Sequence, residues 1–535
     1  MSTSDWVVVA GYGLAMIALS LWLGRGQRTQ ADYYVGGRDL PWWAIGISTM
    51  ATQTSAVSFL SIPAFVALKP GGGLTWLQFE LALPLAMIGV AMLLLPFFRA
   101  LRLISIYEYL ELRFGPGVRT LISGVFLLSR ALGTGVGLYA SAIVLTVVLG
   151  QPIWLTILAM GLLTLVYDTI GGMRAVVWSD VVQGAILIAG IGLCVGYAIA
   201  HAGDLGTALG ALSGDRLRAI DPSLGIDLTG GGDGGVPFWG FLVGGLFLYM
   251  AYYGTDQSQA QRALATRSIA DTRRALYLNG FARFPLTLGY VSLGLVLAAV
   301  FATDAGLRAQ VPADELDFLV PAFIVQELPA GARGMLIAAL LAASMSSMDS
   351  ALNALSAATM RDFVERRHPH LGAAQVMALS RVTTVAWGLV VIAFAFLLGG
   401  ISDTVIEAIN KVGSTFYGPI LAAFLIGVLS RRATSRGIIA GVGAGVAFNL
   451  TLWLLLAGVH WMWWNLTGLV VAALVCTLVS RLGPRPDPAR AGAYTLSGSG
   501  FLHREGLWQP AYRWLLLYFL VLLALLAGLT LLAGS

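Results

Sequence analysis

The chain has 535 residues, of which 58% are hydrophobic and 11% are charged. A soluble domain carries roughly 25% charged residues, so this composition excludes a soluble globular protein and indicates a polytopic membrane protein. The net charge of +5 comes from 32 lysines and arginines against 27 acidic residues. The arginines fall in short clusters between apolar runs, which is typical of membrane-protein loops and predicts no nucleic-acid partner.

The lysines and histidines exclude two further classes of protein. Neither lysine, Lys69 or Lys411, follows the glycine frame of a phosphate-binding loop, so ATP hydrolysis of that kind is excluded. None of the five histidines stands at a catalytic spacing from a nucleophile or a carboxylate within the apolar runs. We therefore do not expect an enzyme.

In chain order, about fourteen apolar stretches reach the roughly 20 residues needed to cross a hydrocarbon core of ~30 Å. Their predicted bounds are 6–24, 42–68, 75–98, 120–149, 152–171, 178–201, 237–262, 275–302, 334–360, 376–399, 402–429, 437–458, 462–480 and 512–533. The first stretch lacks a preceding basic region and a cleavage site, so it is predicted to be a retained helix. We expect an all-α, multi-pass protein of the plasma membrane.

Arginines follow the first, third, seventh, ninth and eleventh stretches, and they share one side if every stretch crosses once. The positive-inside rule makes that side cytoplasmic, which predicts that both termini are extracytoplasmic. On the other side, segment 203–236 is long enough for a short extracellular cap, and 304–333 is expected to hold a short helix. Segment 483–511 is rich in proline and glycine and is predicted to be a flexible cytoplasmic linker.

Polar residues interrupt two of the predicted spans. The sequence STMATQTS occupies the middle of span 42–68, and YYGTDQSQ lies near the end of span 237–262. Both spans are predicted to break inside the membrane, which frees carbonyl oxygens that transporters use to bind a cation such as Na⁺. Because the two breaks lie five helices apart, they suggest an inverted repeat of five plus five helices.

Hydroxyl groups and a carboxylate gather in span 334–360. Ser346, Ser347, Asp349 and Ser350 lie within reach of one helical face. Close packing of small residues is the alternative explanation, but it does not account for the carboxylate.

Several charged residues fall at membrane depth, where each costs about 2.5 to 3.5 kcal/mol unless it faces a cavity or a partner. They are Glu80, Arg130, Asp180, Asp256, Arg283, Asp349 and Lys411. As a set they favour a polar pathway through the bundle, although structural pairing between helices is the alternative for each residue.

Five sequence motifs resemble, in the same order, those of the sodium:solute symporter family, which carries sugars, monocarboxylates, vitamins, iodide, proline and sialic acid. The motifs are DYYVGGRDLPWW at 32–43, ISIYEYLELRFG at 104–115, GGMRAVVWSDVVQ at 171–183, GTDQSQAQR at 254–262 and ASMSSMDSALN at 343–353. The resemblance implies Na⁺-coupled symport by alternating access. It also implies a leucine-transporter-like fold with ten core helices in two inverted repeats.

The same resemblance divides the chain into five segments. These are an N-terminal extra helix (1–30), a first repeat (40–202), an extracellular loop (203–236), a second repeat (237–430) and C-terminal extra helices (431–535). The implied partners are Na⁺, a small solute and the lipid bilayer, and the sequence gives no oligomeric state.

The family's sodium sites can be placed on matching positions of this chain. Those of the main site are the carbonyls of Ala51, Thr54 and Ala343 and the hydroxyls of Ser346 and Ser347. Positions that match a second sodium site of some members are Asp180, Asp349 and Ser350. Asp349 departs from the hydroxyl residue found there in the family, so a proton-coupled carrier that uses Asp180 and Asp349 is the alternative.

Some positions of this chain match the substrate-binding residues of the family's sugar carriers. These positions are Gln53, Ser58, Glu80, Asp256, Arg283 and Asn410. Tyr252 and Tyr253 are candidate gate or stacking groups, or ordinary aromatics of the bundle. Glu80 can accept hydrogen bonds from sugar hydroxyls, which favours a sugar or polyol as substrate. Two motifs look more like the monocarboxylate, vitamin and iodide branch, so an anionic solute attracted by Arg283 and Lys411 is the alternative.

Overall fold

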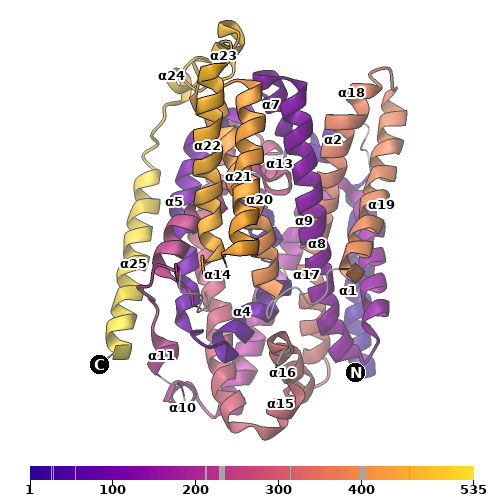
Figure 1. Cartoon of the computed structure of the whole chain (residues 1–535). Coiled ribbons are helices and arrows are strands. Elements are labelled where there is room, and N and C mark those ends of the chain that lie inside the picture. Colours follow the sequence, from indigo (N-terminus) through magenta and orange to yellow (C-terminus); the bar gives the residue numbers. More distant parts are fainter. Residues whose placement is uncertain are drawn as a thin grey trace.

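The structure is a computed structural model that describes residues 1–534 except 26, 28, 55, 211, 213, 228–234, 314, 398–404 and 457. All regular secondary structure in these ranges is helical, which confirms the predicted all-α class. Most of the helices run along one axis of the molecule, and both termini lie at the same end (Figure 1).

The first half of the chain contains α1 (Thr3–Leu23), α2 (Gln30–Val35), η1 (Gly36–Arg38), α3 (Trp42–Gln53), α4 (Ala56–Leu68), η2 (Leu74–Leu77), α5 (Gln78–Leu93), α6 (Leu95–Ala100), α7 (Tyr107–Phe114), α8 (Pro116–Leu149), α9 (Ile153–Ala202), α10 (Leu205–Gly210), α11 (Gly214–Leu217), η3 (Gly240–Gly244), α12 (Gly245–Thr255) and α13 (Gln257–Leu264).

The second half contains α14 (Ile269–Thr303), α15 (Ala305–Gln310), η4 (Leu316–Phe318), α16 (Leu319–Glu327), α17 (Ala332–Thr359), η5 (Met360–Val364), α18 (Glu365–Arg367), α19 (Ala373–Leu397), α20 (Val405–Leu429), α21 (Ser435–Leu455), η6 (Trp461–Trp463), α22 (Trp464–Leu482), α23 (Pro488–Ala493), α24 (Phe501–Glu505) and α25 (Tyr512–Gly534).

In the described part of the chain, 11 helices are long and apolar enough to cross a membrane, and the bent pair α3 and α4 makes up to 12. This count differs from the sequence prediction of about fourteen spans. One reason is that the spans predicted at 152–171 and 178–201 form a single element, α9, of 50 residues. Another is that span 237–262 is divided into the short helices α12 and α13.

A single glycine interrupts α9 where the sequence predicts a gap between two spans. Gly172 has a φ of +56°, a left-handed conformation that favours glycine, and its dihedral angles are not helical. A Cβ atom at this position would lie 2.8 Å from the carbonyl oxygen of Tyr33. The element therefore contains two helical parts joined at Gly172.

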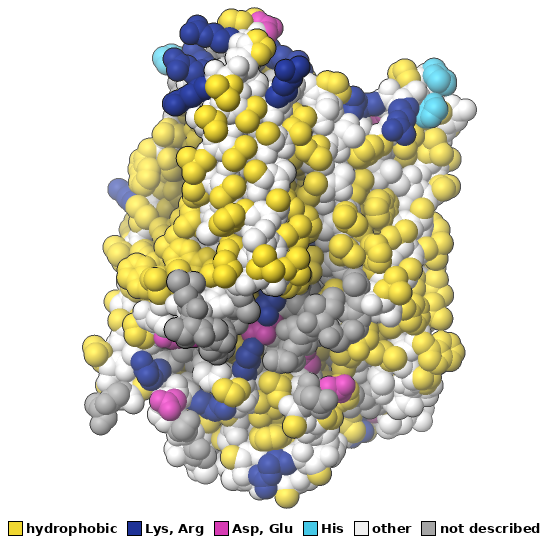
Figure 2. All heavy atoms as spheres, in the orientation of Figure 1, with side chains coloured by type: hydrophobic (Ala, Val, Ile, Leu, Met, Phe, Trp, Pro, Cys, Tyr) yellow, Lys and Arg dark blue, Asp and Glu magenta, His cyan; other side chains and the backbone are white. Residues whose placement is uncertain are grey.

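The two ends of the molecule differ in charge. Figure 2 shows lysine and arginine side chains gathered at the end that carries α23 and α24, with a broad hydrophobic belt next to it. Both termini lie at the opposite end (Figure 1). This arrangement has the asymmetry that the arginine clusters predict, and the assignment of the arginine-rich end to the cytoplasm stays a prediction.

Three connecting segments contain short helices, and one of them is more ordered than the sequence suggests. One short helix is predicted in 304–333, and the segment contains two, α15 and α16, whereas 203–236 contains α10 and α11. The prediction of a flexible linker at 483–511 is wrong. Phe501 is buried, and the backbone N–H of Leu496 donates to the carbonyl oxygen of Val428 at 2.9 Å. These contacts show that the segment packs on the bundle.

Helix α17 lies in the centre of the bundle, and nearly all of its residues are buried. Its sequence is dominated by alanine and serine, whose small side chains let α3, α9 and α13 approach closely. The small residues thus bring the hydroxyl groups of α17 to the broken spans.

Candidate functional site

The first broken span changes direction at Thr54. Helix α3 ends at Gln53, α4 begins at Ala56, and the two axes differ by 54°. The hydroxyls of Thr52 and Thr54 donate to the carbonyl oxygens of Ser48 at 2.9 Å and Met50 at 2.8 Å, and such bonds compete with regular helix. The break confirms the prediction for this span, and the last carbonyl groups of a helix are the ones that other ligands can reach.

The second broken span changes direction at Asp256, between α12 and α13. Its φ and ψ of −84° and 123° are extended, and its Oδ1 accepts from the backbone N of Ser258 at 2.8 Å and from the Ser258 hydroxyl at 2.6 Å. Asp256 therefore serves as the N-cap of α13. The second predicted break is confirmed as well.

The serine pair of α17 faces the protein interior at the first break. The Ser347 hydroxyl donates to the carbonyl oxygen of Thr52 at 3.0 Å and lies 3.4 Å from that of Ala343. Ser346 is only 1% exposed, and its hydroxyl donates to Asp180. The carbonyl oxygen of Ala51 accepts from the N–H of Thr54 at 3.0 Å.

These contacts bring Ser347 to the end of α3 and to Ala343, whereas the Ser346 hydroxyl is directed to Asp180. Ala51 and Thr54 both lie at the end of α3, and the first sodium site that includes them stays a prediction. Its predicted donors are all neutral oxygens, which suit a hard, weakly held monovalent cation. The carbonyl that contacts Ser347 belongs to Thr52, a residue that sequence reasoning did not include.

A buried arginine lies at the predicted second sodium site. Nη2 of Arg262 is 2.9 Å from Oδ2 of Asp180, and both side chains are fully buried. Nε of Arg262 donates to the Ser48 hydroxyl at 2.7 Å, and the guanidinium also donates to Ser350. The positive charge next to Asp180 is therefore supplied by the protein itself in this conformation. Arg262 ends the motif at 254–262, but sequence reasoning gave it no role.

The third predicted member of that site has other partners. Asp349 accepts from the Tyr167 hydroxyl at 2.6 Å and from the Ser350 hydroxyl at 3.0 Å. Asp349 is fully buried, as is Asp180. The two carboxylates thus face different hydrogen-bond donors, with Ser350 in contact with both networks.

A cavity of about 170 Å³ lies beside the first break. It reaches the sodium-site residues, since Thr52 and Ser347 line it. The predicted substrate residues in its wall are Gln53, Ser58, Tyr252, Asp256, Arg283 and Asn410. The cavity also has polar wall residues that the predicted substrate set omits, namely Ser129, Arg130, Thr134, Ser141, Thr164, Ser344 and Tyr417.

Two predicted substrate residues lie outside the described cavity wall. Glu80 is 1% exposed, its Oε1 is 3.3 Å from Nε of Arg283, and it accepts from Thr287 at 2.9 Å and from Tyr249 at 3.3 Å. Its two oxygens therefore accept hydrogen bonds from Thr287 and Tyr249, and its charge forms an ion pair with Arg283. Tyr253 is also buried, and its hydroxyl donates to Oε1 of Gln53.

Arg130 is the cationic wall residue that the substrate assignment missed. Its Nη1 lies 3.5 Å from Oδ2 of Asp256, and its guanidinium lies 5.9 Å from the ring centroid of Tyr252. In the described part of the chain its Nε has no hydrogen-bond partner. The sequence position of Arg130 could have indicated this role, because a charged residue in the middle of a predicted span must face a cavity or a partner.

A family model described as the sodium:solute symporter family matches residues 33–445. The chain belongs to the sodium:solute symporter family. The chain is similar to the sodium/iodide cotransporter of Homo sapiens, which is 32% identical over 464 residues that cover 84% of this chain and 69% of that protein. The family assignment makes the chain a membrane transporter, and Na⁺ is its coupling ion.

Two other relatives cover a similar part of the chain. Sodium-coupled monocarboxylate transporter 1 of Homo sapiens is 30% identical, with 83% of this chain and 72% of that protein covered. The sodium/sialic acid symporter NanT of Aliivibrio fischeri is 27% identical, with 83% of this chain and 86% of that protein covered.

A solved structure of a Na⁺-coupled sialic acid symporter, in a substrate-bound outward-open state, has a TM-score of 0.79 to this symporter. It is 24% identical and covers 91% of this chain and 99% of that one. The likeness confirms the leucine-transporter-like fold class. The segment boundaries of the two repeats stay predictions.

Proposed function

We propose that this symporter carries a small organic anion and binds Na⁺ between the break of α3 and the serine pair of α17. The anion assignment rests on Arg130, which lines the cavity. Its contact with Asp256 is long, since Nη1 of Arg130 is 3.5 Å from Oδ2 of Asp256. Charge-assisted hydrogen bonds of arginine to carboxylates are normally about 2.7–2.9 Å long. A substrate carboxylate would give this guanidinium a closer partner than Asp256 does.

The relatives support an anion over a neutral sugar. The names of the relatives reported above refer to iodide, monocarboxylates and sialic acid. The sugar or polyol preference that Glu80 favours lacks support, because the carboxylate of Glu80 binds Arg283 instead of lining the cavity.

Sodium binding would act on the contact between α3 and α17. The Ser347 hydroxyl now donates to the carbonyl oxygen of Thr52. A cation between the two oxygens would bind a lone pair from each and turn the hydroxyl proton away. Na⁺ would thereby fix the end of α3 against α17 and favour one conformation of the bundle.

Arg283 provides the link between the ion and the substrate. Its guanidinium donates to the Thr54 hydroxyl at the break and also lines the cavity. Gln53, the residue before Thr54, lines the same cavity. An ordered break would therefore place both side chains for the substrate, which gives symport a physical basis.

We infer one sodium ion per transport cycle. A second cation at Asp180 would have to displace the guanidinium of Arg262, which is fully buried and 2.9 Å away. Removing one partner from a buried ion pair leaves an uncompensated charge, so this displacement is unfavourable.

The substrate assignment is tested by uptake into proteoliposomes under an inward Na⁺ gradient, with lactate, nicotinate, biotin and glucose as probes. We expect at least one carboxylate to accumulate and glucose not to. Arg130→Gln should raise the KM for that carboxylate about tenfold or more, because a hydrogen bond to a charged group contributes roughly 1.5–3 kcal/mol. Arg431→Gln, an exposed residue, is the matched control. Accumulation of glucose alone would contradict the assignment.

A further inference from the structure

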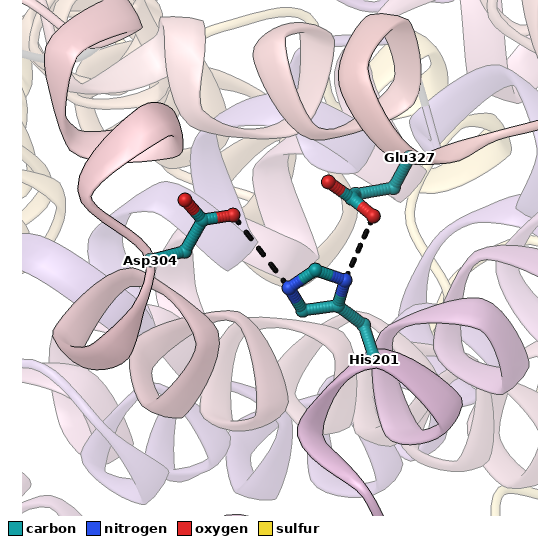
Figure 3. A group of neighbouring side chains, drawn as sticks. All are labelled: His201, Asp304 and Glu327. Atoms are coloured by element: carbon teal, nitrogen blue, oxygen red, sulfur yellow. Dashed lines mark ion pairs between the residues drawn. The ribbon is translucent and has the colours of Figure 1, made fainter.

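Three ionisable side chains from separate elements meet at the end of the molecule that carries both termini (Figures 1 and 3). His201 lies in the last turn of α9, Asp304 lies between α14 and α15, and Glu327 ends α16. One ligand atom from each residue lies within 4.8 Å of the other two. Their side chains are 32%, 15% and 21% exposed, so the cluster is open to ions from solution.

The two contacts of the imidazole are different in kind. Nδ1 of His201 is 2.7 Å from Oε2 of Glu327, which is a short hydrogen bond. Nε2 is 3.6 Å from Oδ2 of Asp304, which is too long for a hydrogen bond. Two ligand atoms that bind one ion tetrahedrally at about 2.0–2.2 Å lie roughly 3.3–3.6 Å apart. The longer separation therefore fits a metal ion between the two atoms.

Three hydrogen bonds fix the position of the Asp304 carboxylate. Its Oδ1 accepts from the backbone N–H groups of Leu307 at 3.1 Å and Gly306 at 2.7 Å, and Gln326 donates to Oδ2 at 2.8 Å. Oδ2 keeps a second lone pair for an ion.

We propose that His201 and Asp304 form a binding site for a divalent transition-metal ion of the Zn²⁺ type, with Glu327 as the positioning residue. Nε2 of His201 and Oδ2 of Asp304 bind the ion, and water completes its coordination. Glu327 accepts the proton of Nδ1 and so fixes the ring and its tautomer, a common arrangement at metal-binding histidines. Imidazole and carboxylate together suit Zn²⁺ better than Ca²⁺ or Na⁺.

A bound ion would connect elements that belong to different parts of the bundle. It would join the end of α9 to the junction of α14 and α15, while Glu327 holds the ring to α16. The chain continues from α16 into α17, which carries Ser346 and Ser347. The site is therefore placed to restrict relative movement of these helices at this end of the molecule.

The test is Zn²⁺ binding to the purified full chain without a histidine tag, measured by competition with a zinc-chelating dye. The variants are His201→Gln, Asp304→Asn and Glu327→Gln, and asparagine at 304 can still cap α15. His503→Ala, at an exposed histidine near the other end of the chain, is the control. A Na⁺-dependent rise in thermal stability in every variant shows that each is folded.

We expect the wild type and His503→Ala to bind one more Zn²⁺ than His201→Gln and Asp304→Asn. Glu327→Gln should weaken that site by about tenfold to a hundredfold, as loss of a positioning partner does at other metal sites. Equal Zn²⁺ binding by the wild type and His201→Gln would overturn the proposal. So would the absence of Zn²⁺ binding in the wild type, which would identify the cluster as an ion pair only.

Discussion

At the scale of single residues, Ser346 and Ser347 are neighbours in sequence, yet their hydroxyls have different partners. Ser347 donates to the carbonyl oxygen of Thr52, whereas Ser346 donates to Asp180. The sequence identifies the pair, because two adjacent hydroxyls beside a carboxylate are unusual in a membrane span. It does not identify their partners, since those depend on how α3 and α9 pack on α17. The role of Arg262 was missed for the same reason.

The pair of Asp180 and Arg262 gives a prediction for stability. Asp180→Asn leaves the buried Arg262 without its counter-charge, so we expect a loss of about 3–5 kcal/mol. The double variant Asp180→Asn with Arg262→Gln should recover part of this loss, because no unpaired charge remains buried. The thermal unfolding midpoint in detergent measures both effects. A double variant less stable than Asp180→Asn would contradict this account of the pair.

At the scale of elements, the two helix breaks and the gap between the two parts of α9 were predictable, but the residue at which α9 turns was not. The breaks at Thr54 and Asp256 occur where polar residues replace an apolar run, so local sequence carries the signal. Gly172 follows another glycine, and only the observed φ of +56° shows which one turns. The docking of 483–511 was missed because burial of Phe501 depends on long-range contacts.

The interruption at Gly172 gives a matched pair of variants. Gly172→Ala should destabilise the protein by roughly 1–3 kcal/mol, because alanine is strained at this φ and its Cβ would meet the Tyr33 carbonyl at 2.8 Å. Gly196→Ala, in the same helix, meets nothing within 4 Å and should be neutral or slightly stabilising. Unfolding midpoints of the two variants compare them, and equal midpoints would count against a requirement for glycine at 172.

At the scale of the whole molecule, the charge asymmetry predicts the orientation in the membrane. The fold class follows from composition and motifs, whereas the position of each terminus relative to the cell follows only from the arginine clusters. Ser2→Cys on intact cells should react with a membrane-impermeant maleimide, and His503→Cys should react only after lysis. The native Cys194 and Cys476 are buried, which keeps the background low. The reverse pattern of labelling would place the termini in the cytoplasm.

Equilibrium binding of radioactive sodium to the purified protein tests whether Na⁺ binds between the end of α3 and the hydroxyl of Ser347. Ser347→Ala should raise the sodium concentration for half-saturation about tenfold, which corresponds to ~1.4 kcal/mol. Ser344→Ala, whose hydroxyl donates to Leu340 within α17 at 2.8 Å, should bind sodium like the wild type. Unchanged sodium binding by Ser347→Ala would contradict the account.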